Sequence, residues 1–167
     1  FDYSAAEHMA VRQKVGMFDM SSFGKIKLIG RDAEAVLQII AANDVAVPVG
    51  KIVYTQFLND DGHIEADVTV TRLGLEEFLI VTPAATIRRD LHWINGHIPD
   101  NAHAIAIDVT VSESVLVVMG PEARSFLQPM IPQSLANDDF AFGTMQPIEI
   151  GHALARAHRV TYVCLLY

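Results

Sequence analysis

KIVYTQFLNDDGHIEADVTVTRL, residues 51–73, decides the fold of this chain. Apolar and polar residues alternate in two runs, 51–58 and 63–73, and a period of two is typical of strands that bury one face. The runs are separated by NDDG, residues 59–62, and a short Asn/Asp/Gly turn between alternating runs is the strongest local signal for a β-hairpin. The segment therefore predicts two antiparallel strands joined by a tight turn.

Strand and helix patterns alternate around this hairpin. Strand-like runs lie at 25–30, 76–83, 103–110, 114–120 and on both sides of Gly151 within 148–163. Helical spacing predicts helices within 7–18, which ends at Gly16, and at 31–42, 84–98 and 121–131. From residue 25 the order is βαββ followed by βαβ. The strands are short, and the two helices among them can cover only one face of a sheet. This pattern predicts an α+β fold of mostly antiparallel sheets with a ferredoxin-like lobe.

The same patterns predict how the 167 residues divide. We expect 26–113 to form the ferredoxin-like antiparallel lobe, and 1–25 with 114–167 to form an incomplete second lobe, because the strand and helix patterns beyond the first lobe stop early. The chain begins without Met and ends in the apolar run VTYVCLLY. We therefore expect it to be part of a longer protein.

Composition excludes several classes of protein. Hydrophobic residues make up 51% and charged residues 19%, which predicts a folded domain. A net charge of −8 has the wrong sign for a surface that tracks phosphates, so we expect no nucleic-acid partner. No apolar run reaches the ~18 residues of a membrane span, and the first residues, FDYSAAEHMAVRQK, do not have the pattern of a signal peptide, so we expect no membrane partner. Cys164 is the one cysteine, and His92 and His97 are not spaced for one helical face, so no metal site is expected.

The hairpin also predicts which side chains are neighbours. If Leu58 pairs with His63, Tyr54 lies directly opposite Asp67 on the same face of the sheet. That face of the second strand is polar, and consists of His63, Glu65, Asp67, Thr69 and Thr71. A polar strand face is most often simply exposed to solvent. The alternative is that the phenol and the carboxylate form part of a site.

Four segments in the same order and spacing resemble the glycine-cleavage aminomethyltransferase (T-protein) family. They are VGMFDMSSFGKIKLIGRDAEAVLQIIAANDV (15–45), YTQFLNDDGHIEADVTVTRL (54–73), FLIVTPAATIRRDLHWI (78–94) and VVMGPEARSFLQ (117–128). MSSFGK and the hairpin look closer to the C-terminal folate-binding domain of dimethylglycine and sarcosine dehydrogenases than to the stand-alone transferase.

The resemblance implies a tetrahydrofolate site. By analogy with the family, Asp67 is the catalytic residue beside the folate nitrogen that takes up the one-carbon unit, and Tyr54 binds the cofactor in the same pocket. A carboxylate suits this chemistry, because an attacking secondary amine must lose a proton and developing positive charge must be stabilised. FAD is expected only on a separate N-terminal domain, because Gly24, Gly30 and Gly120 form no dinucleotide fingerprint.

The resemblance breaks at the end of the chain. After Tyr162 and Val163 the family has a glycine and then a glutamate that hydrogen-bonds the pteridine, whereas here Cys164 and Leu165 follow. This segment alone is therefore expected to lack half of the folate pocket. Arg72 has two interpretations, an anchor for an acidic substrate or, more commonly for a strand end, an ion pair.

The resemblance implies transfer of a one-carbon unit from an N-methyl amine to tetrahydrofolate in a dimethylglycine or sarcosine dehydrogenase-like enzyme, with a small-molecule amine as substrate and a flavin domain as partner. Two alternatives stay open. One is a glycine-cleavage aminomethyltransferase with a lipoyl carrier protein as partner. The other is a non-catalytic folate-binding regulatory protein of the iron-sulfur maintenance type. The expected location is the cytoplasm in a bacterium or the mitochondrial matrix in a eukaryote.

Overall fold

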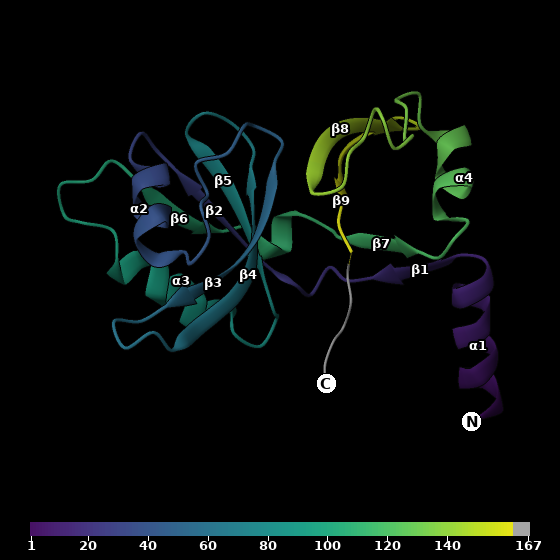
Figure 1. Ribbon diagram of the computed structural model, residues 1–167, viewed down its shortest axis with the longest axis horizontal. Coiled ribbons are helices and arrows are strands. Elements are labelled where there is room, and N and C mark those ends of the chain that lie inside the picture. Colours follow the sequence, from purple (N-terminus) through teal and green to yellow (C-terminus); the bar gives the residue numbers. More distant parts are fainter. Residues whose placement is uncertain (162–167) are drawn as a thin grey trace. The chain divides into compact units, whose positions relative to one another are not determined.

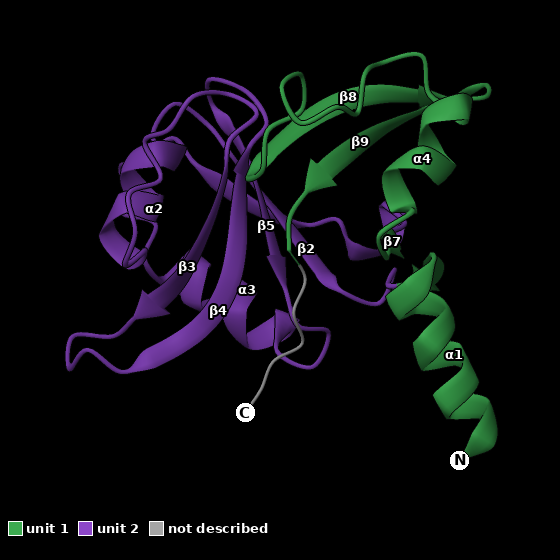
Figure 2. Ribbon diagram, turned by 45° about the vertical axis from the view of Figure 1, so that its right-hand side comes forward, with its two compact units in different colours: residues 1–19, 116–167 green, residues 20–115 purple. Residues whose placement is uncertain are grey.

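The computed structural model describes residues 1–161, which form two compact units (Figures 1 and 2). Unit 2 is Met20–Val115, and unit 1 combines Phe1–Asp19 with the described residues from Leu116 onward, 116–161. Each unit is described by itself. The predicted α+β class with antiparallel sheets is confirmed, whereas the predicted lobe bounds at 26–113, and the incompleteness of the second lobe, stay predictions.

Unit 2 is built on a five-stranded sheet in the order β3-β4-β5-β2-β6. Its strands are β2 (Gly24–Ile29), β3 (Ile52–Leu58), β4 (Ile64–Arg72), β5 (Glu77–Thr82) and β6 (Ile105–Asp108), and its helices are α2 (Ala33–Ile40) and α3 (Ile87–Gly96). All neighbouring strands are antiparallel. β5 and β6 lie on either side of β2, so the α3 crossover spans one strand, which is the split arrangement of ferredoxin-like folds.

Both helices cover the same face of this sheet, as can be followed in Figure 1. The buried core combines alternate strand residues with the apolar stripes of the helices, because successive strand residues point to opposite faces. Its members are Ile26, Leu28, Ala33, Val36, Leu37, Ile40, Val45, Phe57, Ala66, Val68, Val70, Phe78, Ile80 and Ile94. The strand residues that alternate with these core positions point to the other face, which we call the second face. It is the second face that carries Tyr54 and Asp67.

Unit 1 joins the two ends of the described chain. β1 (Gly16–Asp19) pairs with β7 (Leu116–Met119), and β8 (Thr144–Ile150) pairs with β9 (Ala153–Arg159). Its helices are α1 (Asp2–Gln13), α4 (Ala123–Leu127) and a short 3-10 turn at Gln128–Met130, and a second such turn, Thr110–Ser112, lies in unit 2. A small core consists of Ile131, Leu135, Phe140 and Ile148. The predicted pair of strands around Gly151 is confirmed.

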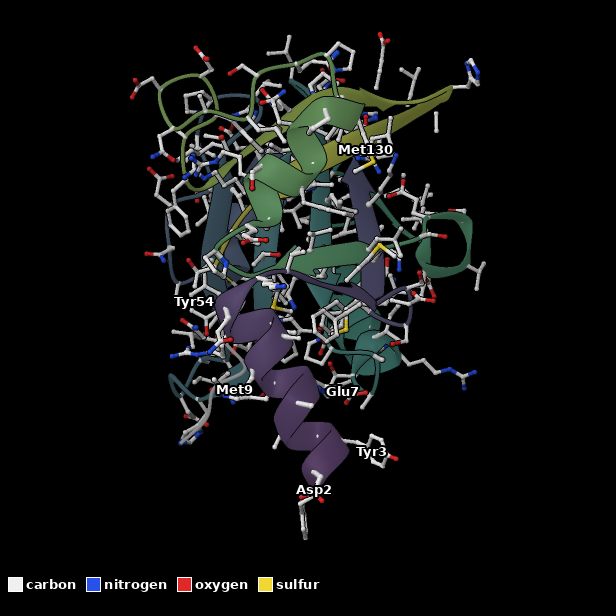
Figure 3. All side chains as sticks on the ribbon, turned by 90° about the vertical axis from the view of Figure 1, so that its right-hand side faces the viewer. Asp2, Tyr3, Glu7, Met9, Tyr54 and Met130 are labelled. Atoms are coloured by element: carbon white, nitrogen blue, oxygen red, sulfur yellow. The ribbon has the colours of Figure 1, made fainter. Side chains whose placement is uncertain are left out.

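The predicted first helix within 7–18 is wrong at its end. The helix ends at Gln13, and 16–19 form a strand instead. The reason is tertiary: a strand distant in the sequence, β7, supplies the hydrogen-bond partners of β1, and such pairing overrides local helical spacing. No residue of α1 is buried, and Figure 3 shows Tyr3, Glu7 and Met9 around it. Within residues 1–161 we find no helix with the length and apolar character of a membrane span.

Candidate functional site

Tyr54 and Asp67 are neighbours on the second face of the sheet. Interaction with the Asp67 carboxylate, together with partial desolvation, raises the pKa of Tyr54 above its ordinary value of 10.0. Gln56 Nε2 also donates to Asp67 Oδ1, at 3.1 Å. The side chain of Tyr54, labelled in Figure 3, is 59% exposed. A phenol and an amide therefore lie beside one accessible carboxylate.

The predicted pairing of Leu58 with His63 is wrong, and Tyr54 is not directly opposite Asp67. Tyr54 pairs with Thr69, and Gln56 is the residue opposite Asp67. Diagonal neighbours on one face remain within reach of an aromatic side chain. The predicted proximity of the phenol and the carboxylate is thus found, with a different register.

The register differs at the turn and again inside β4. In the turn, Asn59 N donates to His63 O at 3.0 Å, and Gly62 N donates to Asn59 O at 2.9 Å. Gly62 has φ +78°, so it adopts the left-handed conformation of a three-residue hairpin loop. Further along, Leu58 pairs with Ile64 but Phe57 pairs with Ala66, so Glu65 is a β-bulge with no partner in β3.

Because of the bulge, the polar face of β4 differs from the predicted one. Ile64, expected on the apolar face, is 67% exposed, whereas Ala66, Val68 and Val70 are buried in the core as predicted. The alternation is interrupted at Glu65 because a bulge residue adds one position without a cross-strand partner.

Beyond the Tyr54–Asp67 contact, the second face becomes apolar. Leu79 of β5 is opposite Thr71 and Val81 is opposite Thr69. Thr71 is fully buried, and its hydroxyl has no hydrogen-bond partner among the described residues. Thr71 and Leu79 are thus buried, whereas the Tyr54 phenol and the Asp67 carboxylate are exposed.

Cations at the far side of this face are already engaged. Lys25, opposite Val81, donates from Nζ to Phe23 O at 2.7 Å and to Ser21 O at 2.9 Å, and burial lowers its pKa below 10.5. Lys27 Nζ lies 2.9 Å from Glu77 Oε1. Both ammonium groups therefore already have partners within the chain, and neither is free to bind a ligand.

Arg72 is engaged by its own chain. Its guanidinium donates to the backbone carbonyls of residues 47, 74 and 75 at 2.9–3.2 Å, lies 2.6 Å from Glu34 Oε2 and stacks over Phe78 with 5.2 Å to the ring centre. These contacts favour the ion-pair interpretation over the substrate-anchor interpretation.

Sequence reasoning missed Gln56 as a contact of Asp67, and a correct register would have found it. The departure from the family at Tyr162, Val163, Cys164 and Leu165 lies outside the described residues.

Comparison with known proteins gives consistent matches. The family described as the GCVT N-terminal domain matches residues 1–166. The chain is 37% identical to 4-methylaminobutanoate oxidase (formaldehyde-forming) of Paenarthrobacter nicotinovorans. The match extends over 163 residues, which are 98% of this chain and 20% of that protein. It is 34% identical over 130 residues to an aminomethyltransferase of Thermotoga petrophila, covering 77% of this chain and 35% of that protein. The chain thus spans about a fifth to a third of the length of these relatives.

Two solved structures share the fold. The glycine cleavage system aminomethyltransferase T of Bartonella henselae superposes with a TM-score of 0.73 at 23% identity, covering 84% of this chain and 37% of that one. A chain of the heterotetrameric sarcosine oxidase of Corynebacterium sp. U-96 superposes with a TM-score of 0.68 at 18% identity, covering 94% of this chain and 78% of that one.

Proposed function

Because the chain belongs to the aminomethyltransferase family through its GCVT N-terminal domain, we propose that it is the folate-binding part of an enzyme that passes a one-carbon unit from an N-methyl amine to tetrahydrofolate. The 37% identical relative supports the amine-oxidising branch, since its name gives an N-methyl amine as substrate and formaldehyde as product. That relative is about five times longer than the matched segment. We place the flavin chemistry in a partner domain or subunit.

The observation that carries this proposal is the placement of Tyr54 and Gln56 beside Asp67 on one face of the hairpin, with Gln56 donating a hydrogen bond to the carboxylate. Tetrahydrofolate, when bound, would supply the nucleophilic nitrogen. The chemistry then requires a base, because a secondary amine that forms a bond to carbon must release its N–H proton. Asp67 takes up that proton, while Gln56 orients its carboxylate by a hydrogen bond and Tyr54 lies beside it.

The test uses the full-length protein that contains this chain. Its amine-dependent formation of methylene-tetrahydrofolate is compared with formation of free formaldehyde when folate is absent. We expect Asp67→Asn to reduce the folate-dependent rate by about 100-fold or more, the usual contribution of a general base, while amine oxidation continues. Asp61→Asn is the matched control, because Asp61 is an exposed carboxylate in the same hairpin. Near-normal folate-dependent turnover of Asp67→Asn would refute the proposal.

A second candidate is a glycine-cleavage aminomethyltransferase, supported by the 34% identical relative. In that case methylene-tetrahydrofolate forms from an aminomethyl group on a lipoyl carrier protein and not from a free N-methyl amine. Binding of tetrahydrofolate without turnover of either donor would instead support the non-catalytic alternative.

A further inference from the structure

The bulge at Glu65 decides which face of the sheet Asp67 occupies. At the turn Asn59 contacts His63, and the next pair is Leu58 with Ile64. Without a bulge this register would continue, and Asp67 would pair with Thr55. Since a shift of one residue turns every side chain to the other face, Asp67 would then point toward the helices, away from Tyr54. The extra residue moves Asp67 opposite Gln56.

The bulge is held at both its backbone and its side chain. Arg89 of α3 donates a hydrogen bond from Nη2 to the carbonyl oxygen of Glu65. Asn59 Nδ2 donates to Glu65 Oε1 at 2.9 Å. A bulge leaves backbone groups without ladder partners, and Arg89 supplies the missing donor from another element of the fold.

Arg89 is in turn attached to the core. Its Nε lies 3.3 Å from Asp90 Oδ1. Asp90 is 1% exposed, and its other oxygen accepts hydrogen bonds from the hydroxyls of Thr86, at 2.7 Å, and of Thr82 at the end of β5. Buried polar groups that are fully hydrogen-bonded rigidify their surroundings. The Glu65 carbonyl is therefore linked through the side chains of Arg89 and Asp90 to the C-terminal end of the neighbouring strand, β5.

We propose that Arg89 is a positioning residue for Asp67, acting through the carbonyl of the Glu65 bulge. This inference rests on the proposed function of Asp67. Glu65 is two residues from Asp67, so a change in the bulge is transmitted directly along β4 to the carboxylate. Displacement of a catalytic group by about 1 Å can reduce a rate by about 100-fold, so precise support of the bulge has consequences for turnover.

The experiment compares Arg89→Ala, Arg89→Lys and Arg88→Ala in the full-length protein. Arg88 is the matched control, since it is the exposed neighbouring arginine of the same helix. Two quantities are measured: kcat and KM for amine-dependent formation of methylene-tetrahydrofolate, and the pKa of Tyr54 by NMR of ring-labelled tyrosine, assigned with Tyr54→Phe. Thermal unfolding of each variant verifies that it is folded.

We expect Arg89→Ala to lower kcat by about 10- to 100-fold with little change in KM, and to lower the Tyr54 pKa toward its ordinary value as the contact with Asp67 loosens. Arg89→Lys should recover part of both, because it retains a donor, and Arg88→Ala should change neither. If Arg89→Ala matches Arg88→Ala in kcat and in the Tyr54 pKa, the positioning role is wrong. If the protein has no folate-dependent turnover, the proposed function is refuted. The pKa of Tyr54 does not depend on turnover, so its measurement still shows whether Arg89 controls the contact between Tyr54 and Asp67.

Discussion

Arg72→Met should destabilise unit 2 without affecting folate binding. Arg72 is the last residue of β4, and its side chain is 15% exposed. The substitution removes three hydrogen bonds to backbone carbonyls, an ion pair with Glu34 and a cation–π contact with Phe78. Methionine keeps much of the apolar packing of the arginine stem. The loss is therefore chiefly polar.

The magnitude follows from these contacts. Each hydrogen bond contributes about 0.5–1.5 kcal/mol net, the partly exposed ion pair about 0.5 kcal/mol and the cation–π contact about 0.5–1 kcal/mol. Contacts made by one side chain are not additive, and water can replace some of the lost donors. We expect a loss of about 3 kcal/mol in the free energy of unfolding.

The assay is urea unfolding of the 167-residue chain, followed by the fluorescence of its one tryptophan, Trp93. With a slope of about 1.5–2 kcal/mol per molar urea, the midpoint should fall by roughly 1.5–2 M. The control is Arg88→Met, which removes an exposed arginine and should change stability by less than about 0.5 kcal/mol. If Arg72→Met behaves like this control while KM for tetrahydrofolate rises in the full-length enzyme, Arg72 is a substrate anchor and the structural interpretation is wrong.

Asp67→Asn should lower the pKa of Tyr54 toward 10.0, measured by tyrosine NMR, because the carboxylate that favours the neutral phenol is removed. In the wild-type protein, the stability that this contact contributes is present below about pH 10 and is lost as the pH rises through the raised pKa of Tyr54. The pKa of Asp32 is lowered to about 2 by hydrogen bonds from the neighbouring arginine and a backbone N–H. Asp32→Ala should therefore be less stable than wild type at pH 7, and the difference should disappear in urea titrations as the pH falls from about 4 toward 2. Gly30→Ala should cost more than about 2 kcal/mol, because Gly30 has φ +136° and a Cβ would lie 2.1 Å from a backbone oxygen. Gly96→Ala, which meets no atom within 4 Å, should be neutral or slightly stabilising in the same unfolding assay.

Local pattern was sufficient where one segment buries one face. The alternation around 59–62 predicted the hairpin, and helical spacing predicted α2 and α3, since these periodicities are direct consequences of packing against a single core. The first helix was predicted in part only, because the strand that follows it depends on a partner, β7, from the other end of the chain.

The sequence by itself determined the order of strands and helices and the presence of a phenol and a carboxylate in the two arms of one hairpin. It did not determine their register. Only the tertiary structure places the bulge at Glu65, because the donor to its carbonyl comes from Arg89, 24 residues further along the chain. A period of two shows that residues alternate, but the face of a side chain depends on where pairing starts and where it is interrupted. The turn sets the start locally, whereas a contact distant in sequence supports the interruption at Glu65.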